Sequence, residues 1–437
     1  MLLEFRTKNY KSFKDELVFS LIPAPKQKGL DYSILHEKIA SKKYKALCSA
    51  VIYGPNAAGK SNIIGAMEVL QSIVLRGNIR DGERRSIPNA AVNSLELIPN
   101  RSYHLAEPVH FSIKFIEDGL LLEYQLVLDL GLFLEDDYKR TVLSEKLFVN
   151  ERMIFSRENG LNFEDLKVIG PYLNNEFENN ANGAISLARG NLNGEELFLM
   201  NGFKTMFSSK LVSIVSNWLE HKFMAIYRAD AVQLIRRFSD PKKKTVYVEK
   251  TTNEAAQLFG INSNALGYVV HDEESEARLY SLFEGRQSLP AEIFESHGTV
   301  RFVNIFPLII NALLNGGTLI VDEFESALHP MALMSIVNLF HNNDLNKKNA
   351  QLIFNTHNPI FLNANLFRRD EIKFVERDEN THNSIHYSLS DFGTSGDNAV
   401  RIHGDYMKNY FIGRYGAITD IDFTSIFEDV LKEREEV

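Results

Sequence analysis

The chain has 437 residues, of which 44% are hydrophobic and 24% are charged, so it is long enough for a large buried core and more than one domain. Its formal net charge of −9 argues against a surface coated for non-specific binding to nucleic acid. A single cysteine, Cys48, excludes a disulfide within the chain and fits a reducing compartment.

The first elements predicted along the chain are short strands at residues 2–5 and 17–21, joined by a turn. A longer apolar strand follows at residues 46–53, with Cys48 as a small core residue. Apolar residues then recur at helical spacing from Lys60 to about Leu75. A strand, loop and helix in this order are typical of an α/β fold.

The middle of the chain alternates in hydrophobicity, which predicts a hairpin over residues 109–128 and strands at residues 142–149 and 153–156. Residues 197–223 favour helix, residues 236–244 form a basic loop, and residues 268–270 and 277–283 favour short strands. A helix at residues 302–314, ended by Gly316 and Gly317, precedes two fully apolar strands at residues 318–321 and 351–355.

The segment between the strand at residues 46–53 and the following helix matches a phosphate-binding loop. Glycine, four residues and Gly-Lys-Ser stand in the strand-to-helix context that this motif requires. Backbone amides and the helix N-terminus are expected to hold phosphates, Lys60 to reach the β- and γ-phosphates, and Ser61 to ligate Mg²⁺. The predicted nucleotide-binding residues are Gly54, Asn56, Ala57, Ala58, Gly59, Lys60, Ser61 and Asn62. A glycine-containing turn with an accidental lysine is the less favoured interpretation.

The strand at residues 318–321 ends in Asp322 and Glu323, the Walker B pattern. Asp322 is expected to support Mg²⁺ at the carboxyl edge of the sheet, and Glu323 to act as general base on the attacking water. A strand with a solvated acidic end is common, so the motif becomes specific only when it is paired with the phosphate-binding loop.

Two further segments indicate which class of ATPase this is. His357 follows the apolar strand at residues 351–355, where a polar residue can sense the γ-phosphate. Ser296, Gly298 and Thr299 start the helix that leads to Asp322, and we predict that they contact ATP bound by a second subunit. Structural alternatives remain: a lone histidine is more often structural, and the serine in its simplest role caps the helix.

The order of these motifs resembles ABC-type ATPases, and most closely the soluble SMC/RecF/OLD branch. Within that branch it is similar to prokaryotic phage-defence ATPases of the AbiL, RloC and PARIS AriA kind. The likeness is carried by residues 9–13, 54–62, 295–299, 322–330, 369–376 and 413–418. It covers both ends of the chain well and the middle poorly.

This resemblance implies roles for individual residues. Lys60 and Ser61 would bind phosphate and Mg²⁺, Asp322 would support the metal, Glu323 would be the catalytic base and His357 the γ-phosphate switch. The signature residues Ser296 and Gly298 would act in trans, and residues 327–329 would couple the two sites. Three departures are His297 in place of a small signature residue, the lack of a well-placed Q-loop glutamine because Gln71 comes too early, and Thr419 where the subgroup often has proline.

The predicted fold class is therefore α/β, a P-loop ABC-type ATPase head with a mixed sheet flanked by helices. We expect residues 1–132 to form its N-terminal half and residues 290–437 its C-terminal half with an extension. Residues 133–289 are expected to form an inserted α+β lobe rather than a long coiled coil, because sustained heptads are missing.

Functionally, the chain is expected to bind ATP and Mg²⁺, to hydrolyse ATP slowly, and to form a homodimer through an ATP sandwich or a higher even-numbered oligomer. The resemblance implies a sensor and scaffold of anti-phage defence, with a separate toxic effector protein and a phage trigger. A nuclease domain of the Toprim type is not expected, because the residues after Val375 are fewer than such a domain usually needs. A RecF-like DNA-associated ATPase and an ATP-locked structural module stay open, as does nucleic-acid binding by the basic loop. No signal-peptide pattern or membrane span is expected, which favours a cytoplasmic protein.

Overall fold

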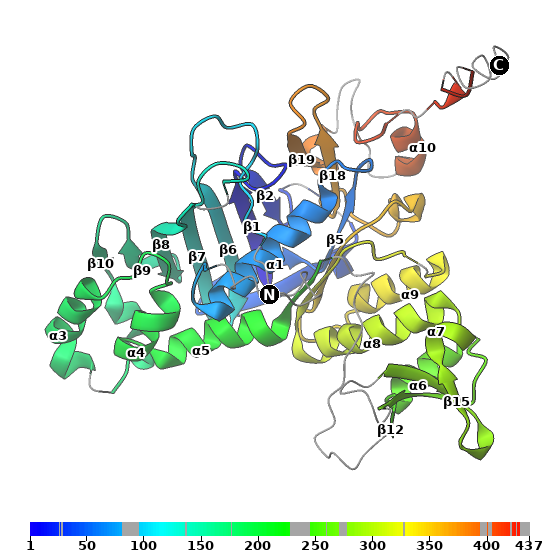
Figure 1. Cartoon of the computed structure of the whole chain (residues 1–437), viewed down its shortest axis with the longest axis horizontal. Coiled ribbons are helices and arrows are strands. Elements are labelled where there is room, and N and C mark those ends of the chain that lie inside the picture. Colours follow the sequence, from blue (N-terminus) through cyan, green and yellow to red (C-terminus); the bar gives the residue numbers. More distant parts are fainter. Residues whose placement is uncertain are drawn as a thin grey trace.

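A six-stranded mixed sheet forms the centre of the molecule in the computed structural model (Figure 1). The structure describes all residues except 26, 28, 81–95, 136–137, 176, 228–244, 259, 271–277, 327, 394–399, 401–403, 420–421, 425 and 429–437. The strand order is β11 (Phe223–Ile226), β16 (Thr318–Val321), β17 (Gln351–Asn355), β5 (Ser49–Tyr53), β18 (Ile372–Arg377) and β19 (Ser384–Ser388). The first five are parallel, so their carboxyl ends meet at one edge, and β19 is antiparallel to β18.

The alternation of side chains along β5 divides the core into two halves. Ala50 and Ile52 pack toward α1 (Lys60–Arg76), whereas Val51 and Tyr53 pack on the other face with α8 (His297–Asn315) and α9 (Pro330–His341). Every residue of β5, β16 and β17 is buried, as predicted for strands covered on both faces.

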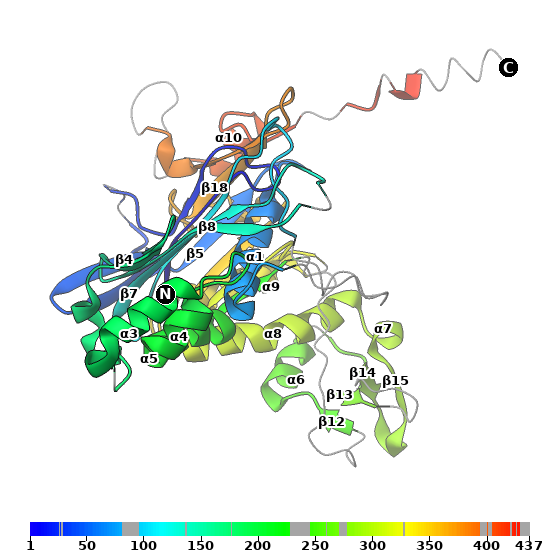
Figure 2. The same ribbon diagram turned by 60° about the vertical axis from the view of Figure 1, so that its left-hand side comes forward.

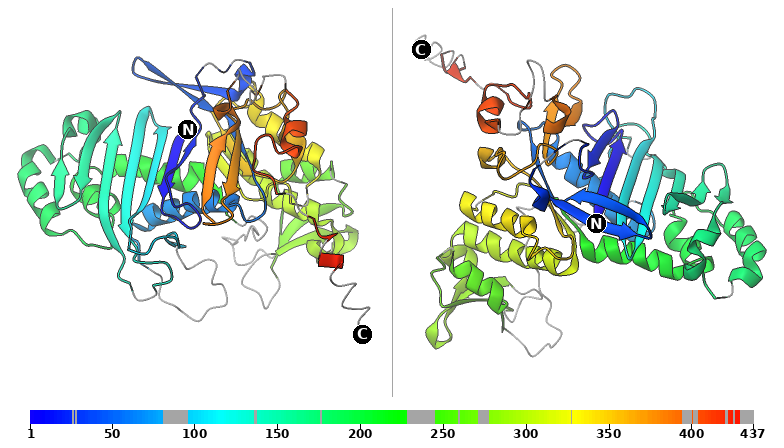
Figure 3. Two further views of the ribbon diagram at one scale, coloured as in Figure 1. Left: turned by 90° about the horizontal axis from the view of Figure 1, so that it is seen from above. Right: turned by 180° about the vertical axis from the view of Figure 1, so that it is seen from behind.

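A second, seven-stranded antiparallel sheet packs against the other side of α1, so this helix lies between two sheets. Its order is β10 (Leu161–Phe163), β9 (Arg152–Arg157), β8 (Thr141–Val149), β7 (Leu120–Asp129), β6 (Val109–Glu117), β1 (Leu2–Lys8) and β2 (Leu17–Ser20). The predicted hairpin is confirmed, with Val109 opposite Leu128. Figure 3 shows the amino-terminal strands beside β18 and β19, where β19 contacts β2.

A smaller four-stranded antiparallel sheet lies beside the start of α8 (Figure 2). It consists of β12 (Thr245–Tyr247), β13 (Ala265–Val269), β14 (Arg278–Leu282) and β15 (Ser288–Pro290), with α6 (Lys250–Gln257) and α7 (Ala291–Phe294). The hairpin β3 (Ile34–Ile39) and β4 (Lys42–Leu47) packs on β1. Among the described residues, the other α-helices are α3 (Phe177–Gly190), α4 (Lys204–Met206), α5 (Ser209–Asn217) and α10 (Tyr406–Phe411).

The strands of residues 133–289 do not all pair among themselves. Strands β8 to β10 continue the antiparallel sheet of β1, β6 and β7, and β11 pairs with β16 in the central sheet. Only β12 to β14 belong to the small separate sheet, whose fourth strand β15 crosses the predicted boundary at residue 289. The three-part division of the chain stays a prediction, and these pairings cross it.

Two local predictions differ from the structure. The strand expected at residues 46–53 is two strands, β4 and β5, separated by the buried Cys48. The single helix expected at residues 197–223 is interrupted at Phe207 and Ser208, which separate two helical segments, and the second segment ends at Lys222, so that Phe223 begins β11. A short apolar run such as that of β11 has no periodicity that separates helix from strand. The basic loop at residues 236–244 lies outside the described residues.

One described helix is long and apolar enough to cross a membrane by length and composition, namely α8. Of its most apolar 18-residue window, 44% is buried inside the protein. Since a core helix passes the same test and α8 packs against the central sheet, the helix is weak support for a span.

Candidate nucleotide site

The phosphate-binding loop connects β5 to α1 at the carboxyl edge of the central sheet. A Cβ at Gly54 would lie closer than 3.0 Å to the backbone oxygen of Val375 on β18. Gly59, the N-cap of α1, has φ 109°, and a Cβ there would meet the hydroxyls of Ser384 and Ser12. Both glycines are therefore required by close approach, and Gly59 also by its backbone angle.

Two segments far from the loop in sequence hold it in place. The Ser384 hydroxyl, on β19, donates to the carbonyl of Ala58 at 2.5 Å. The Asn62 amide donates to the Ser12 hydroxyl at 2.8 Å, in the turn between β1 and β2. Asn62, predicted to bind nucleotide, is thus engaged with Ser12, and the contributions of Ser12 and Ser384 were not predicted from the sequence.

Lys60 is buried beneath the loop. Its Nζ donates to the carbonyls of Gly54 at 2.9 Å and Pro55 at 3.0 Å. Burial lowers the pKa of Lys60 from 10.5 to about 8, against the opposing effect of the nearby carboxylates of Glu325, Asp322 and Glu323. The ammonium thus remains charged at neutral pH, although its burial costs solvation free energy. A bound anion in the loop would offset that loss of solvation.

Asn355 joins the two acidic residues of the Walker B motif. Its Nδ2 donates to Asp322 Oδ1 and its Oδ1 accepts from the Glu323 backbone N–H, both at 2.5 Å. Asn355 is the last residue of β17 and is 1% exposed. From the sequence, Asn355 was predicted only as part of a strand, because nothing local indicates that it lies beside Asp322.

Glu323 has φ 49°, in the left-handed region, and its side chain is exposed. Asn355 holds its N–H, and Arg301 Nη2 donates to its carbonyl at 2.7 Å. Arg301 lies on α8 in the turn after Ser296, so the predicted signature helix is bonded directly to the backbone of the predicted base.

His357 follows β17 at the same edge, and its backbone N–H donates to Glu325 Oε1 at 2.5 Å. Burial, and then the charge of Lys60, lower the pKa of the His357 imidazole below 6.5, with Glu325 acting in the opposite direction. At neutral pH the imidazole is therefore neutral and interacts through hydrogen bonds rather than through charge.

These elements surround a cavity of about 340 Å³. It is lined by Asn56, Ala57, Gly59, Lys60, Ser61, Asn62, Glu323, Asn355 and His357. The structure thus brings most of the predicted phosphate-binding residues together with Glu323 and His357. A helix N-terminus, a buried lysine, a serine hydroxyl and nearby carboxylates suit a nucleoside triphosphate with Mg²⁺.

The signature residues are not part of this cavity. Ser296 is exposed and caps α8, where its hydroxyl accepts from the Thr299 N–H at 3.1 Å and contacts the Thr299 hydroxyl at 2.8 Å. Thr299 is buried and Gly298 is half-buried. The capping role is therefore present, and the role of Ser296 and Gly298 in trans stays a prediction.

Other residues singled out in the sequence have structural partners. Gln71 donates to the carbonyls of Leu219 and Phe223 and so ties α1 to the start of β11. His329 caps α9 by accepting from the Met331 N–H at 3.2 Å. Residue 327 of the predicted coupling loop lies outside the described residues, and Leu328 is buried.

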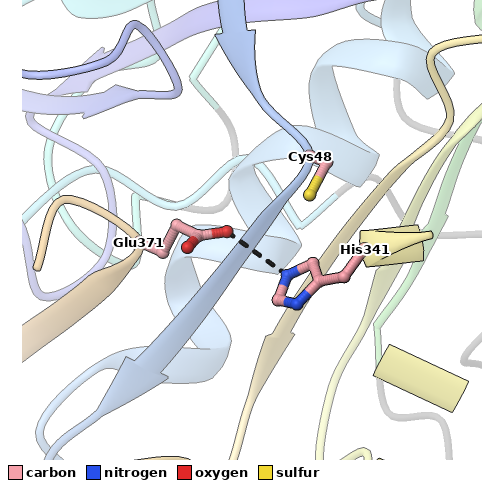
Figure 4. A group of neighbouring side chains, drawn as sticks. All are labelled: Cys48, His341 and Glu371. Carbon is pink, nitrogen blue, oxygen red and sulfur yellow. Dashed lines mark ion pairs between the residues drawn. The ribbon is translucent and has the colours of Figure 1, made fainter. Parts of the chain in front are cut away.

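Cys48, His341 and Glu371 form a second cluster, at the amino ends of β5 and β18 and thus at the opposite edge of the sheet (Figure 4). Their potential ligand atoms lie within 4.8 Å of one another. The Ser49 hydroxyl already joins two of them, donating to Glu371 Oε1 at 2.5 Å and lying 2.8 Å from His341 Nε2. Burial raises the pKa of the Cys48 thiol well above its usual value. Through these buried contacts, the cluster connects the start of β5, the end of α9 and the start of β18.

Comparison with known families gives one match that covers most of the chain. Residues 49–363 match the family described as "AAA domain, putative AbiEii toxin, Type IV TA system". The chain belongs to this family. The match begins with β5 and includes the phosphate-binding loop, Asp322, Glu323 and His357, and it identifies the chain as an AAA/ABC-type P-loop ATPase.

Among curated proteins, the chain is similar to the "Retron Vc95 probable ATPase" of Vibrio cholerae serotype O1 biovar El Tor. The two are 25% identical over 199 residues, which is 46% of this chain and 37% of that relative. The matched part thus spans little more than a third of the relative's length. The resemblance to defence-related ATPases is confirmed at this level.

Similar solved structures include an SMC head domain from Thermotoga maritima (14% identity, TM-score 0.35) and an SMC head bound to the C-terminal winged-helix domain of ScpA (12% identity, TM-score 0.40). Each alignment covers 89% of this chain and 98% of the other. Scores this low carry no argument about function. Within the described residues the longest helix is α8, with 19 residues, so no long coiled coil is present there.

Proposed function

We propose that the cavity at the carboxyl edge of the central sheet binds and hydrolyses ATP with Mg²⁺. The observation that supports this most directly is the convergence of the phosphate-binding loop with Glu323, Asn355 and His357 around one cavity. Lys60 would hold the β- and γ-phosphates, and Ser61 and Asp322 would hold Mg²⁺, which neutralises phosphate charge when bound.

Glu323 is the residue best placed to act as general base. Glu323 lines the cavity, and its backbone is fixed on both sides by Asn355 and Arg301. It would accept a proton from the water that attacks the γ-phosphorus, as the bond to the β,γ-bridging oxygen breaks and ADP leaves. The neutral His357 imidazole would hydrogen-bond to the γ-phosphate.

The site of one chain lacks the signature residues, since Ser296 is exposed and outside the cavity. In the proposed assembly, Ser296, Gly298 and the start of α8 from a second copy close the cavity over the γ-phosphate. The N-terminus of a 19-residue helix carries a partial positive charge that suits an anion there. ATP would then hold two copies together, in a dimer or a larger even-numbered assembly.

For the biological role, we propose a sensor and scaffold of anti-phage defence in the cytoplasm. The family description names a putative toxin of a toxin–antitoxin system, and the curated relative is a probable ATPase of a retron. In this proposal a phage trigger alters the ATP-dependent assembly, and a separate effector protein is released or activated.

The decisive experiment uses the Glu323→Gln variant, which removes the base and leaves the predicted metal ligands intact. Its native mass is measured by light scattering with and without Mg·ATP, beside the exposed-site control Glu379→Gln. We expect the variant to bind ATP without turnover and to double in mass, whereas the control turns over like the wild type. Normal turnover by the variant would exclude Glu323 as base, and an unchanged mass would exclude assembly around ATP.

A further inference from the structure

Glu325 lies two residues after the proposed base and has no role in the mechanism above. Its Oε1 accepts the His357 backbone N–H at 2.5 Å. Its Oε2 is buried and has no hydrogen-bond partner among the described residues. A buried carboxylate oxygen without a donor is rare in native proteins.

The other backbone amides of the loop after β17 bond to β5 or within the loop. The Thr356 N–H donates to Ile52 O at 3.1 Å, and the Asn358 N–H donates to the Thr356 hydroxyl at 2.9 Å. His357 is different, because its amide bonds across to the loop that carries Glu323. Glu325 therefore links the two loops that carry the proposed base and the proposed γ-phosphate sensor.

The loop that carries Glu325 is itself fixed by turns. The Ser326 N–H donates to Glu323 O and the Leu328 N–H donates to Glu325 O, both at 3.0 Å. The Glu325 side chain thus extends from a defined backbone, and its bond to His357 fixes the separation of the two loops.

The same carboxylate also acts electrostatically on two residues of the site, Lys60 and His357. Of the nearby carboxylates, Glu325 has the largest raising effect on the pKa of Lys60. It also opposes the lowering of the pKa of His357. An ionised acceptor also gives a stronger bond to a backbone N–H than a neutral one. The charge of Glu325 therefore favours both the ammonium of Lys60 and the position of His357.

We propose that Glu325 is a positioning residue for ATP hydrolysis, which holds His357 against the γ-phosphate through its backbone. This inference rests on the proposed function, because it gives Glu325 an effect on the reaction only through His357. It goes further, because it gives Glu325 the role of positioning His357. The alternatives would be to bind the metal or to act as the base.

A double-mutant cycle with Glu325→Ala, His357→Ala and the combined variant tests the proposal. We expect Glu325→Ala to lower kcat between about tenfold and hundredfold, as for a misplaced catalytic group. KM and the Kd for a non-hydrolysable ATP analogue should change less than about threefold. In the His357→Ala background, Glu325→Ala should cause no further loss of kcat. Glu325→Gln should retain more activity than Glu325→Ala, because its amide oxygen can accept the same bond without the charge, and Glu379→Ala is the matched exposed control.

The outcomes separate this inference from the proposed function. If His357→Ala is impaired and Glu325→Ala adds its full loss to it, Glu325 acts independently and the inference is wrong. If His357→Ala hydrolyses ATP at the wild-type rate, the proposed sensor role fails and the inference fails with it. If Glu325→Ala does not fold, the cycle is repeated with Glu325→Asp, which keeps the charge but is one methylene too short to reach the His357 N–H.

Discussion

Replacement of Lys60 by methionine should make the nucleotide-free protein more stable while removing its function. Burial lowers the pKa of Lys60 from 10.5 to about 8. At pH 7 that difference corresponds to roughly 3 kcal/mol of unfavourable free energy in the folded state. Loss of the two hydrogen bonds to Gly54 O and Pro55 O removes about 2 kcal/mol of stabilisation. The net expectation at pH 7 is a gain of about 1 kcal/mol for Lys60→Met.

The sign of the pH dependence follows from the direction of the shift. The pKa of Lys60 is lower in the folded state, so the penalty is fully present below about pH 8 and fades as the pH rises toward 10.5. At pH 9.5 the wild type should have recovered roughly 2 kcal/mol relative to Lys60→Met. The variant, which has no group to titrate at this position, should then be the less stable of the two.

Urea denaturation at pH 7 and pH 9.5, with and without Mg·ATP, measures both effects. Mg·ATP at about one hundred times its Kd should stabilise the wild type by about 2.7 kcal/mol and should not stabilise Lys60→Met. A variant that is less stable than the wild type by the same amount at both pH values would refute the argument from burial. Stabilisation of the variant by Mg·ATP would refute the role of Lys60 in binding.

Three further predictions concern the loop, the acidic pair and the signature. Gly54→Ala should weaken ATP binding at least about tenfold, because the added Cβ meets the Val375 backbone and displaces the loop; unchanged affinity in calorimetry would contradict this. Asn355→Ala should lower the free energy of unfolding by about 2–4 kcal/mol in denaturation, since Asp322 and the Glu323 N–H lose a buried partner; a change below about 0.5 kcal/mol would argue against that bridge. Ser296→Ala should lower kcat while leaving the Kd of the isolated chain for ATP unchanged, and an equal loss in both would exclude action in trans.

Much of the candidate site is local in sequence and could be predicted. The phosphate-binding loop needs glycines at fixed positions, an apolar strand before it and a helix after it, and all of these lie within residues 49–76. The same holds for β16 with Asp322, for β17 with the residues that follow it, and for the serine cap of α8. The patterns are reliable because hydrophobic periodicity and backbone requirements act over one or two elements.

Partners that come from distant segments could not be predicted in this way. Ser384 reaches Ala58 across 326 positions, and Asn355 reaches Asp322 across 33. Arg301 meets the Glu323 carbonyl because α8 packs on the same sheet, and β11 is a strand because it pairs with β16. None of these residues has a neighbour in sequence that reveals its partner.

The sequence by itself therefore determined the chemistry of this protein, a P-loop ATPase with its acidic pair and candidate sensor, because each motif is built by a contiguous segment. Only the tertiary structure decided how these motifs are held together: Ser12 and Ser384 on the loop, Asn355 between Asp322 and Glu323, and Glu325 on His357. The physical reason is that hydrogen bonds between loops depend on the order of strands in the sheet. That order is set by packing across the whole core.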